Sequence, residues 1–189
     1  NRLVSAAIAA CMSLTMFAGA ANLDTADASK TETLTGTASV VKADGVVDTQ
    51  FEYTVPVDAT KEERAEIARQ AAKEAAGLAT VGRAARGESL LAAGANVPLR
   101  TNRWYSLTAS NFKADGGYVE ITMSDIEDST TVRVELNNAV KSKAVRNSDA
   151  IVVFYDQEYI KIYQGNPVSV AFQGTPTGVA GIVSVYQVY

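Results

Sequence analysis

The residue types that commonly perform catalysis are scarce in this chain of 189 residues. The sequence contains no histidine, so the commonest general base and the commonest metal ligand are both missing. Its single cysteine, Cys11, lies inside an apolar N-terminal run. No phosphate-binding glycine loop, nucleophile elbow or dinucleotide fingerprint occurs. We therefore predict a protein that is not an enzyme. Hydrolysis by a pair of carboxylates remains as the alternative.

One run of acidic residues could contribute ligands to a cation. Asp125, Glu127 and Asp128 lie close together within the segment 124–129. Calcium takes about six to eight oxygen ligands, and a loop with several carboxylates supplies some of them. The spacing matches no known calcium loop, so a solvated acidic turn is the favoured interpretation. A calcium site is the alternative, and the sequence indicates no other cofactor.

Aromatic residues suggest a surface for ligands. In the run from Tyr159 to Tyr163, strand alternation places both tyrosines on one face if Ile160 and Ile162 face the core. Exposed aromatic rings stack on sugars or anchor a protein partner. Tyr159, Tyr163 and Trp104 are therefore the candidate ligand-binding residues. The favoured interpretation, however, is that the second sheet covers one face of this strand and the Ala-rich helix covers the other.

A basic segment, 83–103, fits neither a strand nor a helix pattern over its whole length. It contains Arg83 and Arg86, three residues apart, and a short helix is predicted over 88–93. A loop of this length is either functional or disordered. The Arg83–Arg86 motif could be a point of proteolytic processing, but a solvated basic loop is favoured.

The N-terminal segment 1–20 has the pattern of a secretory signal peptide. Arg2 precedes an apolar run over 3–17, and Ala18-Gly19-Ala20 supplies a cleavage signal. The apolar run is short for a membrane span, which leaves a retained anchor as the less favoured interpretation. We expect a flexible leader over 21–34 and a secreted or cell-surface protein with no stable membrane span. Removal of Cys11 would leave a mature chain without cysteine.

Composition indicates an ordinary globular chain. Hydrophobic residues make up 47% and charged residues 20% of the sequence. The net charge of −4 and the pI near 4.9 argue against a nucleic-acid partner, which rewards clustered positive charge. The length suits one domain, which we place at 35–189, with a helix and the basic loop inserted at 58–103.

The clearest helix pattern lies at about 60–80. Thr60 and Glu63 form a capping box, in which each residue satisfies a backbone amide of the other. Gly77 or Gly82 can end the helix in the left-handed conformation. A narrow apolar stripe predicts a helix lying flat on a sheet, with a partner-helix surface as the alternative. The stripe consists of Ala68, Ala71, Ala72, Ala75 and Ala79.

The rest of the chain reads as strands separated by turns. Runs 35–43 and 46–57 form a predicted hairpin through Asp44-Gly45, and Pro56 marks an edge or a strand end. Frequent turns from Trp104 onward predict an antiparallel β-sandwich or jelly roll, with the Ala-rich helix packed on one sheet. The expected later strands are 103–110, 118–124, 130–137, 139–145, 151–156, 158–163, 168–173 and 181–189.

These observations favour a secreted, non-catalytic protein that acts by surface contact, as an adhesion or assembly subunit. Strand edges are templates for pairing with another chain, which would give self-association or binding to a protein partner. Charges at Lys42 and Asp48 could instead blunt the edge of the first hairpin. A carbohydrate-binding module and a small carboxylate-dependent hydrolase are the two other hypotheses.

Overall fold

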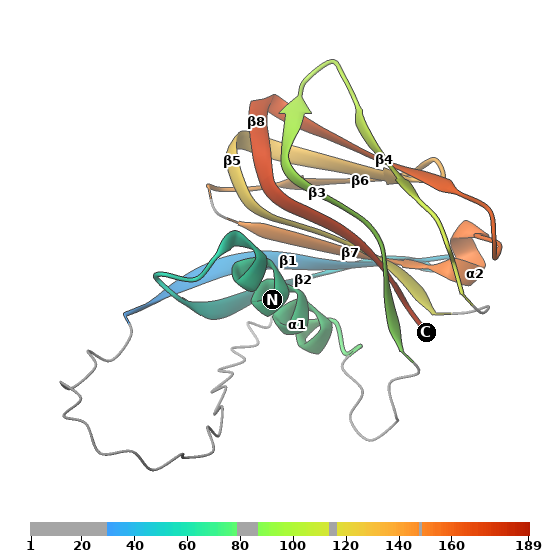
Figure 1. Ribbon diagram of the computed structural model, residues 1–189, viewed down its shortest axis with the longest axis horizontal. Coiled ribbons are helices and arrows are strands. Elements are labelled where there is room, and N and C mark those ends of the chain that lie inside the picture. The colour runs from blue at the N-terminus through green and yellow to red at the C-terminus, as the bar shows by residue number, and fades with distance from the viewer. Residues whose placement is uncertain (1–29, 79–86, 114–116, 148) are drawn as a thin grey trace, which may run out of the picture.

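A computed structural model describes residues 30–78, 87–113, 117–147 and 149–189, and this part of the chain is mainly β (Figure 1). The strands form one eight-stranded mixed sheet in the order β2-β1-β7-β5-β8-β3, with β4 paired to β8 and β6 paired to β5. The elements are β1 (Thr31–Lys42), β2 (Gly45–Pro56), α1 (Lys61–Ala75), β3 (Glu88–Arg100), β4 (Tyr105–Ala109), β5 (Tyr118–Leu136), β6 (Ala139–Ala144), β7 (Ala150–Asp156), α2 (Gln157–Ile160) and β8 (Val168–Val188).

The predicted β class is confirmed, but a wholly antiparallel order is wrong. Strands β1 and β7 run parallel, with Val40 opposite Phe154. Strand β7 lies between β1 and β5, so the last forty residues do not form four consecutive antiparallel strands. Every residue from Ala150 to Tyr155 is buried. An uninterrupted apolar run is typical of a central strand covered on both faces, which explains its position.

Two long strands replace four predicted short ones. Strand β5 has 19 residues and β8 has 21, and they pair antiparallel from Tyr118 opposite Val188 to Leu136 opposite Val170. The first part of β5 pairs with β7 and its last part with β6. The first part of β8 pairs with β4 and its last part with β3. Figure 1 shows that both strands curve strongly along their length.

The curve is located where an acidic turn was predicted. Asp125 and Asp128 have positive φ values of 48° and 58°, and the register with β8 shifts on both sides of Ser129. Aspartate tolerates this left-handed conformation better than most residues, and extra residues of this kind bend a strand. A Cβ atom on Gly178 of β8 would lie 2.1 Å from the Glu127 carbonyl oxygen. The backbones therefore approach closely at the bend, and β5 continues through it.

Two apolar clusters hold the sheet. The larger one draws side chains from both ends of β5 and β8 and from one face of β7, including Ile121, Val134, Val153, Phe172 and Val185. The second cluster lies on the other face, where α1 packs over β1, β2 and β7. The strands between these two clusters are therefore covered on both sides.

Helix α1 confirms the sequence-based prediction in its cap and its buried face. The Glu63 backbone N–H donates to Thr60 Oγ1 at 3.2 Å, and the Thr60 N–H donates to Glu63 Oε2 at 2.8 Å. The helix ends at Ala75, and Gly77 has a φ of 70°. The stripe from Ala68 to Ala75 faces the sheet, with Ala68 and Ala72 fully buried, while Ala79 lies outside the described residues. Small side chains let the helix axis approach the strands closely.

Two segments differ in type from the prediction. Residues 88–100, expected in the basic loop with a helix at 88–93, form strand β3 along β8. Residues 157–160, expected at the start of a strand, form the short helix α2, which Asp156 caps. Ile160 and Ile162 are buried and Tyr159 and Tyr163 are exposed, so the favoured expectation that both faces of this segment are covered is wrong. Their burial comes from the packing of α2 and of Ile162 against the larger apolar cluster and not from strand alternation, because these residues are not in a strand.

The first hairpin is confirmed with shifted boundaries. Strand β1 begins at Thr31, so residues 31–34 belong to the sheet and not to a leader. Lys42 lies opposite Gly45, which places the tip of the hairpin at Ala43-Asp44, one residue earlier than predicted. Pro56 is the last residue of β2 and lies on an edge strand, as expected.

We predict that Gly178→Ala destabilises the fold by about 1–3 kcal/mol, because a new methyl group must displace the β5 backbone at the bend. Urea unfolding followed by circular dichroism measures the change. Ser169→Ala, an exposed position on the same strand, serves as the control and should change stability by less than about 0.5 kcal/mol. Equal stability of the two variants would contradict the close approach.

Candidate interaction sites

Strand β2 forms an open edge of the sheet. It ends the sheet path, and no other described strand pairs with its outer side. Its register with β1 is unbroken from Gly45 to Pro56. The Val57 N–H donates to the Lys30 carbonyl oxygen at 2.8 Å, so by alternation the nitrogen of Pro56 faces away from β1. The same alternation directs the backbone groups of Val46, Asp48, Gln50, Glu52 and Thr54 outward.

The other described edges carry features that oppose pairing. Strand β6 has six residues and two lysines, Lys141 and Lys143, and β4 has five residues. Strand β3 has a register shift between Leu90 and Ala92 and an internal proline, Pro98. Short length, lysine, proline and irregular register all blunt an edge. Strand β2 has 12 residues and contains no lysine, no arginine and no proline before its last position.

The two charges that were expected to protect this hairpin are engaged within the chain. Asp48 accepts a hydrogen bond from Ser39 Oγ at 2.6 Å and one from Lys141 Nζ at 3.0 Å. Burial acts to raise the pKa of Asp48, but these contacts outweigh it and the pKa lies below its usual range. Lys42 Nζ lies 5.8 Å from the centre of the Tyr118 ring. Neither charge stands free beside the outer side of β2.

A polar hollow of about 470 Å³ borders the same edge. Gln50 and Glu52 of β2 line one side of it, and Lys143 and Arg146 line the other. Arg146 is exposed, and none of the described carboxylates forms an ion pair with its guanidinium. A strand added to β2 would direct every second side chain toward this hollow. The edge therefore offers side-chain contacts in addition to backbone groups.

Exposed valines lie at both ends of β2. Val46 and Val47 follow the hairpin tip and are 50% and 65% exposed, and Val57 after the strand is 51% exposed. Single exposed valines are common at protein surfaces. Their position on an unpaired edge is what makes them relevant, because apolar side chains on an open strand favour association.

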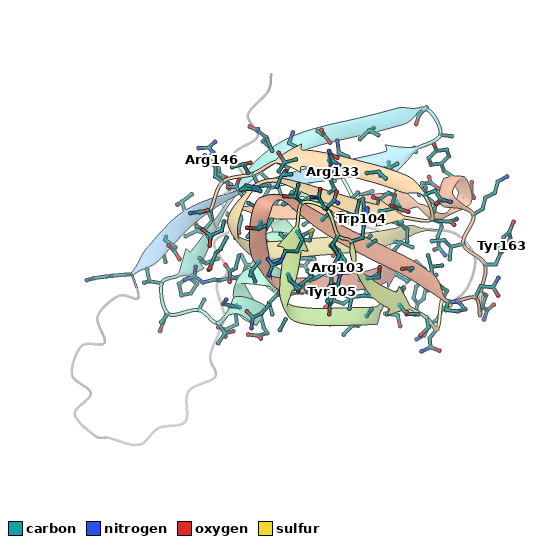
Figure 2. The ribbon with its side chains drawn as sticks, turned by 90° about the horizontal axis from the view of Figure 1, so that it is seen from above. Arg103, Trp104, Tyr105, Arg133, Arg146 and Tyr163 are labelled. Carbon is teal, nitrogen blue, oxygen red and sulfur yellow. The ribbon has the colours of Figure 1, made fainter. Side chains whose placement is uncertain are left out.

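The three aromatic candidates do not form one platform. Tyr159 and Tyr163 belong to α2 and the loop after it, and they are 47% and 63% exposed. Trp104 lies in the connection between β3 and β4 and is half-buried. Figure 2 shows Tyr163 at one end of the molecule, well separated from Trp104. One short sugar chain could therefore not stack on Trp104 and Tyr163 together.

The acidic candidates belong to the bend of β5. Asp125, Glu127 and Asp128 follow one another along a single strand. Across the described ranges, no group of three or more residues of the metal-binding types is placed to hold an ion. Burial raises the pKa of Asp125, and Arg64 and Lys61 oppose that rise. The structure thus gives these residues a part in shaping the backbone and adds nothing to the calcium hypothesis.

A buried ionic cluster lies between α1 and the sheet, and sequence reasoning did not find it. Arg69 Nε lies 2.5 Å from Glu120 Oε1, and Lys73 Nζ lies 3.6 Å from Glu120 Oε2. Arg69 Nη2 and Lys73 Nζ also contact the two carboxylate oxygens of Glu88 at the start of β3. Glu120 of β5 is 0% exposed, and the side chains of Arg69 and Lys73 are 3% and 7% exposed. Tyr186 of β8 completes the cluster, because its ring centre lies 3.8 Å from the Arg69 guanidinium.

Burial and charge act in opposite directions in this cluster. Burial raises the pKa of Glu120 and outweighs the attraction of Arg69 and Lys73. Burial also acts to raise the pKa of Glu88, but hydrogen bonds from Lys73 and Arg69 outweigh it, and the pKa lies below its usual range. Glu66 adds a third carboxylate, 3.1 Å from Arg69. Three carboxylates against two cations leave one excess negative charge, which favours a proton on Glu120.

The sequence did contain a signal for this cluster. Along β5, Val119 and Ile121 face one side of the sheet. Glu120 and Thr122 face the other side. Arg69 and Lys73 are four residues apart and lie next to the buried Ala68 and Ala72. A charged pair beside an apolar helix stripe needs a partner when the stripe docks, and a lone glutamate inside an apolar strand supplies it.

The cluster does not support hydrolysis. Glu88 and Glu120 converge on the same cations, yet Glu120 is fully buried. A groove of about 360 Å³ beside α1 is lined by Glu66, Arg69, Tyr186 and neighbouring residues, and neither Glu88 nor Glu120 reaches it. A glycosidase needs both carboxylates beside the bond to be cleaved.

Several expectations concern residues outside the described ranges. These are the signal peptide over 1–20, the leader as far as residue 29, and the processing motif at Arg83 and Arg86. Within the described ranges, neither helix has the length and apolar character needed to cross a membrane.

Comparison of the chain with protein-family models, curated proteins and solved structures gave no match in any of the three.

We predict that Glu120 makes stability fall as pH rises. Its pKa is raised in the folded state, so the folded protein retains a proton that the unfolded chain, with an ordinary value of about 4.3, has lost. Stability contributed by that proton is present at low pH and is lost as pH rises through the folded pKa. The unfolding free energy of the parent minus that of Glu120→Gln should therefore decrease between about pH 4 and pH 8.

Urea unfolding at a series of pH values gives this difference. Glu74→Gln changes an exposed carboxylate of the same helix outside the cluster and should leave the pH dependence of the parent unchanged. If the unfolding free energy of the parent minus that of Glu120→Gln rose with pH, the raised pKa assigned to Glu120 would be contradicted.

Proposed function

We propose that this protein is an exported, non-catalytic subunit that acts by pairing the open edge of β2 with the same edge of a second copy. The observation that carries the proposal is the contrast between edges. Strand β2 is long, regular and free of lysine, whereas β3, β4 and β6 each carry a feature that opposes pairing. Natural proteins generally protect an edge of this kind unless they use it.

Two identical edges related by a two-fold axis must run in opposite directions. Pairing would therefore be antiparallel and would extend the sheet across both copies. The outward backbone groups from Val46 to Thr54 supply the hydrogen bonds of such a ladder. The neighbouring hollow, with Gln50 and Arg146 on opposite sides, would receive side chains of the second copy.

The same proposal includes a two-layered body. The larger apolar cluster takes side chains from both ends of β5 and β8, so the two halves of the bent sheet enclose it as layers of a sandwich would. In this arrangement β2 ends the sheet path, and its outer side is unpaired among the described strands. Export is supported by the sequence pattern of residues 1–20.

We predict that Val47→Lys and Gln50→Pro abolish self-association. Lysine on the exposed Val47 places a charge on the pairing edge. Proline at Gln50 removes an outward N–H while leaving the ladder with β1 intact, because the backbone of Gln50 faces away from β1. Light scattering across a concentration series should give a dimer for the parent and a monomer for both variants.

Val140→Lys is the matched control, because Val140 is 53% exposed and lies on the edge strand β6. This variant should dimerise like the parent. A parent that stays monomeric at high concentration would sink the proposal, as would equal loss of the dimer in Val47→Lys and Val140→Lys.

A further inference from the structure

The ionic cluster under α1 places an amine against a carboxyl group, with a second carboxyl group close to both. Lys73 Nζ contacts Glu88 Oε1, and the buried Glu120 Oε2 lies 3.6 Å from the same nitrogen. Arg69 Nη2 contacts the other oxygen of Glu88, Oε2. This geometry holds a nucleophile, an electrophilic carbon, a proton relay and a cation in one place.

We propose that Lys73 and Glu88 join through an isopeptide bond between Lys73 Nζ and Glu88 Cδ, with release of one water molecule. The proposal is independent of the β2 edge. It assigns a covalent modification to residues that otherwise form an ion pair.

The step balances without a cofactor. Proton transfer from the Lys73 ammonium to the Glu88 carboxylate gives a neutral amine and a neutral acid, and the amine then attacks Cδ. The tetrahedral intermediate carries its negative charge on Oε2, which the Arg69 guanidinium contacts. The protonated Glu120 gives its proton to the Oε1 hydroxyl, which becomes the leaving water, and the resulting carboxylate then takes a proton from the nitrogen. Water then leaves, and the amide remains.

Position and burial favour the product. Groups held in contact react as if present at an effective concentration of about 10⁵–10⁸ M, which offsets the competition from water. The Lys73 side chain is 7% exposed and Glu120 is 0% exposed, so bulk water is largely kept from the nitrogen and the relay. The Glu88 side chain is 35% exposed, so the released water can reach solvent. The raised pKa of Glu120 suits a group that takes and returns a proton.

The bond would meet a structural need of this chain. Helix α1 docks through alanines, which bury little apolar area. The only cysteine of the sequence is Cys11, which the predicted signal cleavage would remove, so disulfides are not an alternative crosslink. A link from α1 to β3 would fix the helix on the sheet. It would also keep the two parts of the chain joined after any cleavage at Arg83 or Arg86.

Peptide mapping of the full chain tests the bond. After folding, denaturation and digestion with trypsin, the expected product is a branched peptide that joins residues 70–83 to residues 87–100. Its mass is the sum of the two peptides minus one water molecule, and cleavage after Lys73 is blocked. Linear peptides ending at Lys73, with no branched product, would overturn the proposal.

Three variants distinguish formation of the amide bond from the simple ion pair between Lys73 and Glu88. Lys73→Arg keeps the positive charge and should yield linear peptides alone. Glu88→Gln should still form the branch, because loss of ammonia from glutamine gives the same amide. Glu120→Gln should lower the branched yield at least tenfold at a fixed time after folding, and an unchanged yield would overturn the relay.

The pair of Lys141 and Asp48 is an internal control in the same digest. The Lys141 Nζ and Asp48 Oδ2 atoms lie 3.0 Å apart, but no buried second carboxylate from the described residues forms an ion pair with Lys141 or Lys143. It should give linear peptides only. A branch at this pair, or a Lys73–Glu88 branch in chain kept in denaturant throughout, would show that the crosslink does not depend on the cluster and would overturn the proposal.

Discussion

The constraint on which this fold depends is the continuous pairing of β5 with β8 through a bend. The two strands stay hydrogen-bonded from Tyr118 to Leu136 while both change direction. Positive φ values at Asp125 and Asp128 turn β5, and Gly178 lets β8 follow at close range. Because the pairing survives the bend, the ends of the same two strands can enclose a single apolar cluster. Every other strand is positioned by one half or the other of this pair, directly or through β7.

The strand order also determines which edges the molecule presents. The half of the sheet that carries β4 and β6 ends in short strands, and one of them is rich in lysine. The other half extends through β7 and β1 to β2, which is long and regular. Asp48 turns toward Lys141 and Lys143 of β6 and links the two halves, which uses the charge that would otherwise stand near this edge. Strand β2 therefore ends the longer arm of the sheet, with its outer side unpaired among the described strands.

Helix α1 contacts the sheet in two ways, through a small apolar surface of alanines and through the buried ion pairs of Arg69 and Lys73 with Glu120. Its alanines approach the strands closely, and that approach carries Arg69 and Lys73 onto Glu120. A buried pair of this kind is costly to assemble and more costly to break, because removing one partner leaves an unpaired charge. The cluster therefore fixes the orientation of the helix more than it adds to stability. The same placement brings Lys73 against Glu88 across the segment that joins α1 to β3.

The sequence by itself determined the features that depend on neighbouring residues. These include the β class, the first hairpin, and the capping box of Thr60 and Glu63, because local hydrogen bonds and residue patterns fix them. Tertiary structure alone decided that 118–136 and 168–188 are single strands, since a turn and a bulge use the same residue types. It also decided that 88–100 is a strand, that β7 lies parallel to β1, and that Glu120 meets Arg69. Each of these depends on partners distant in the chain, and no local pattern specifies which strand or charge will lie opposite.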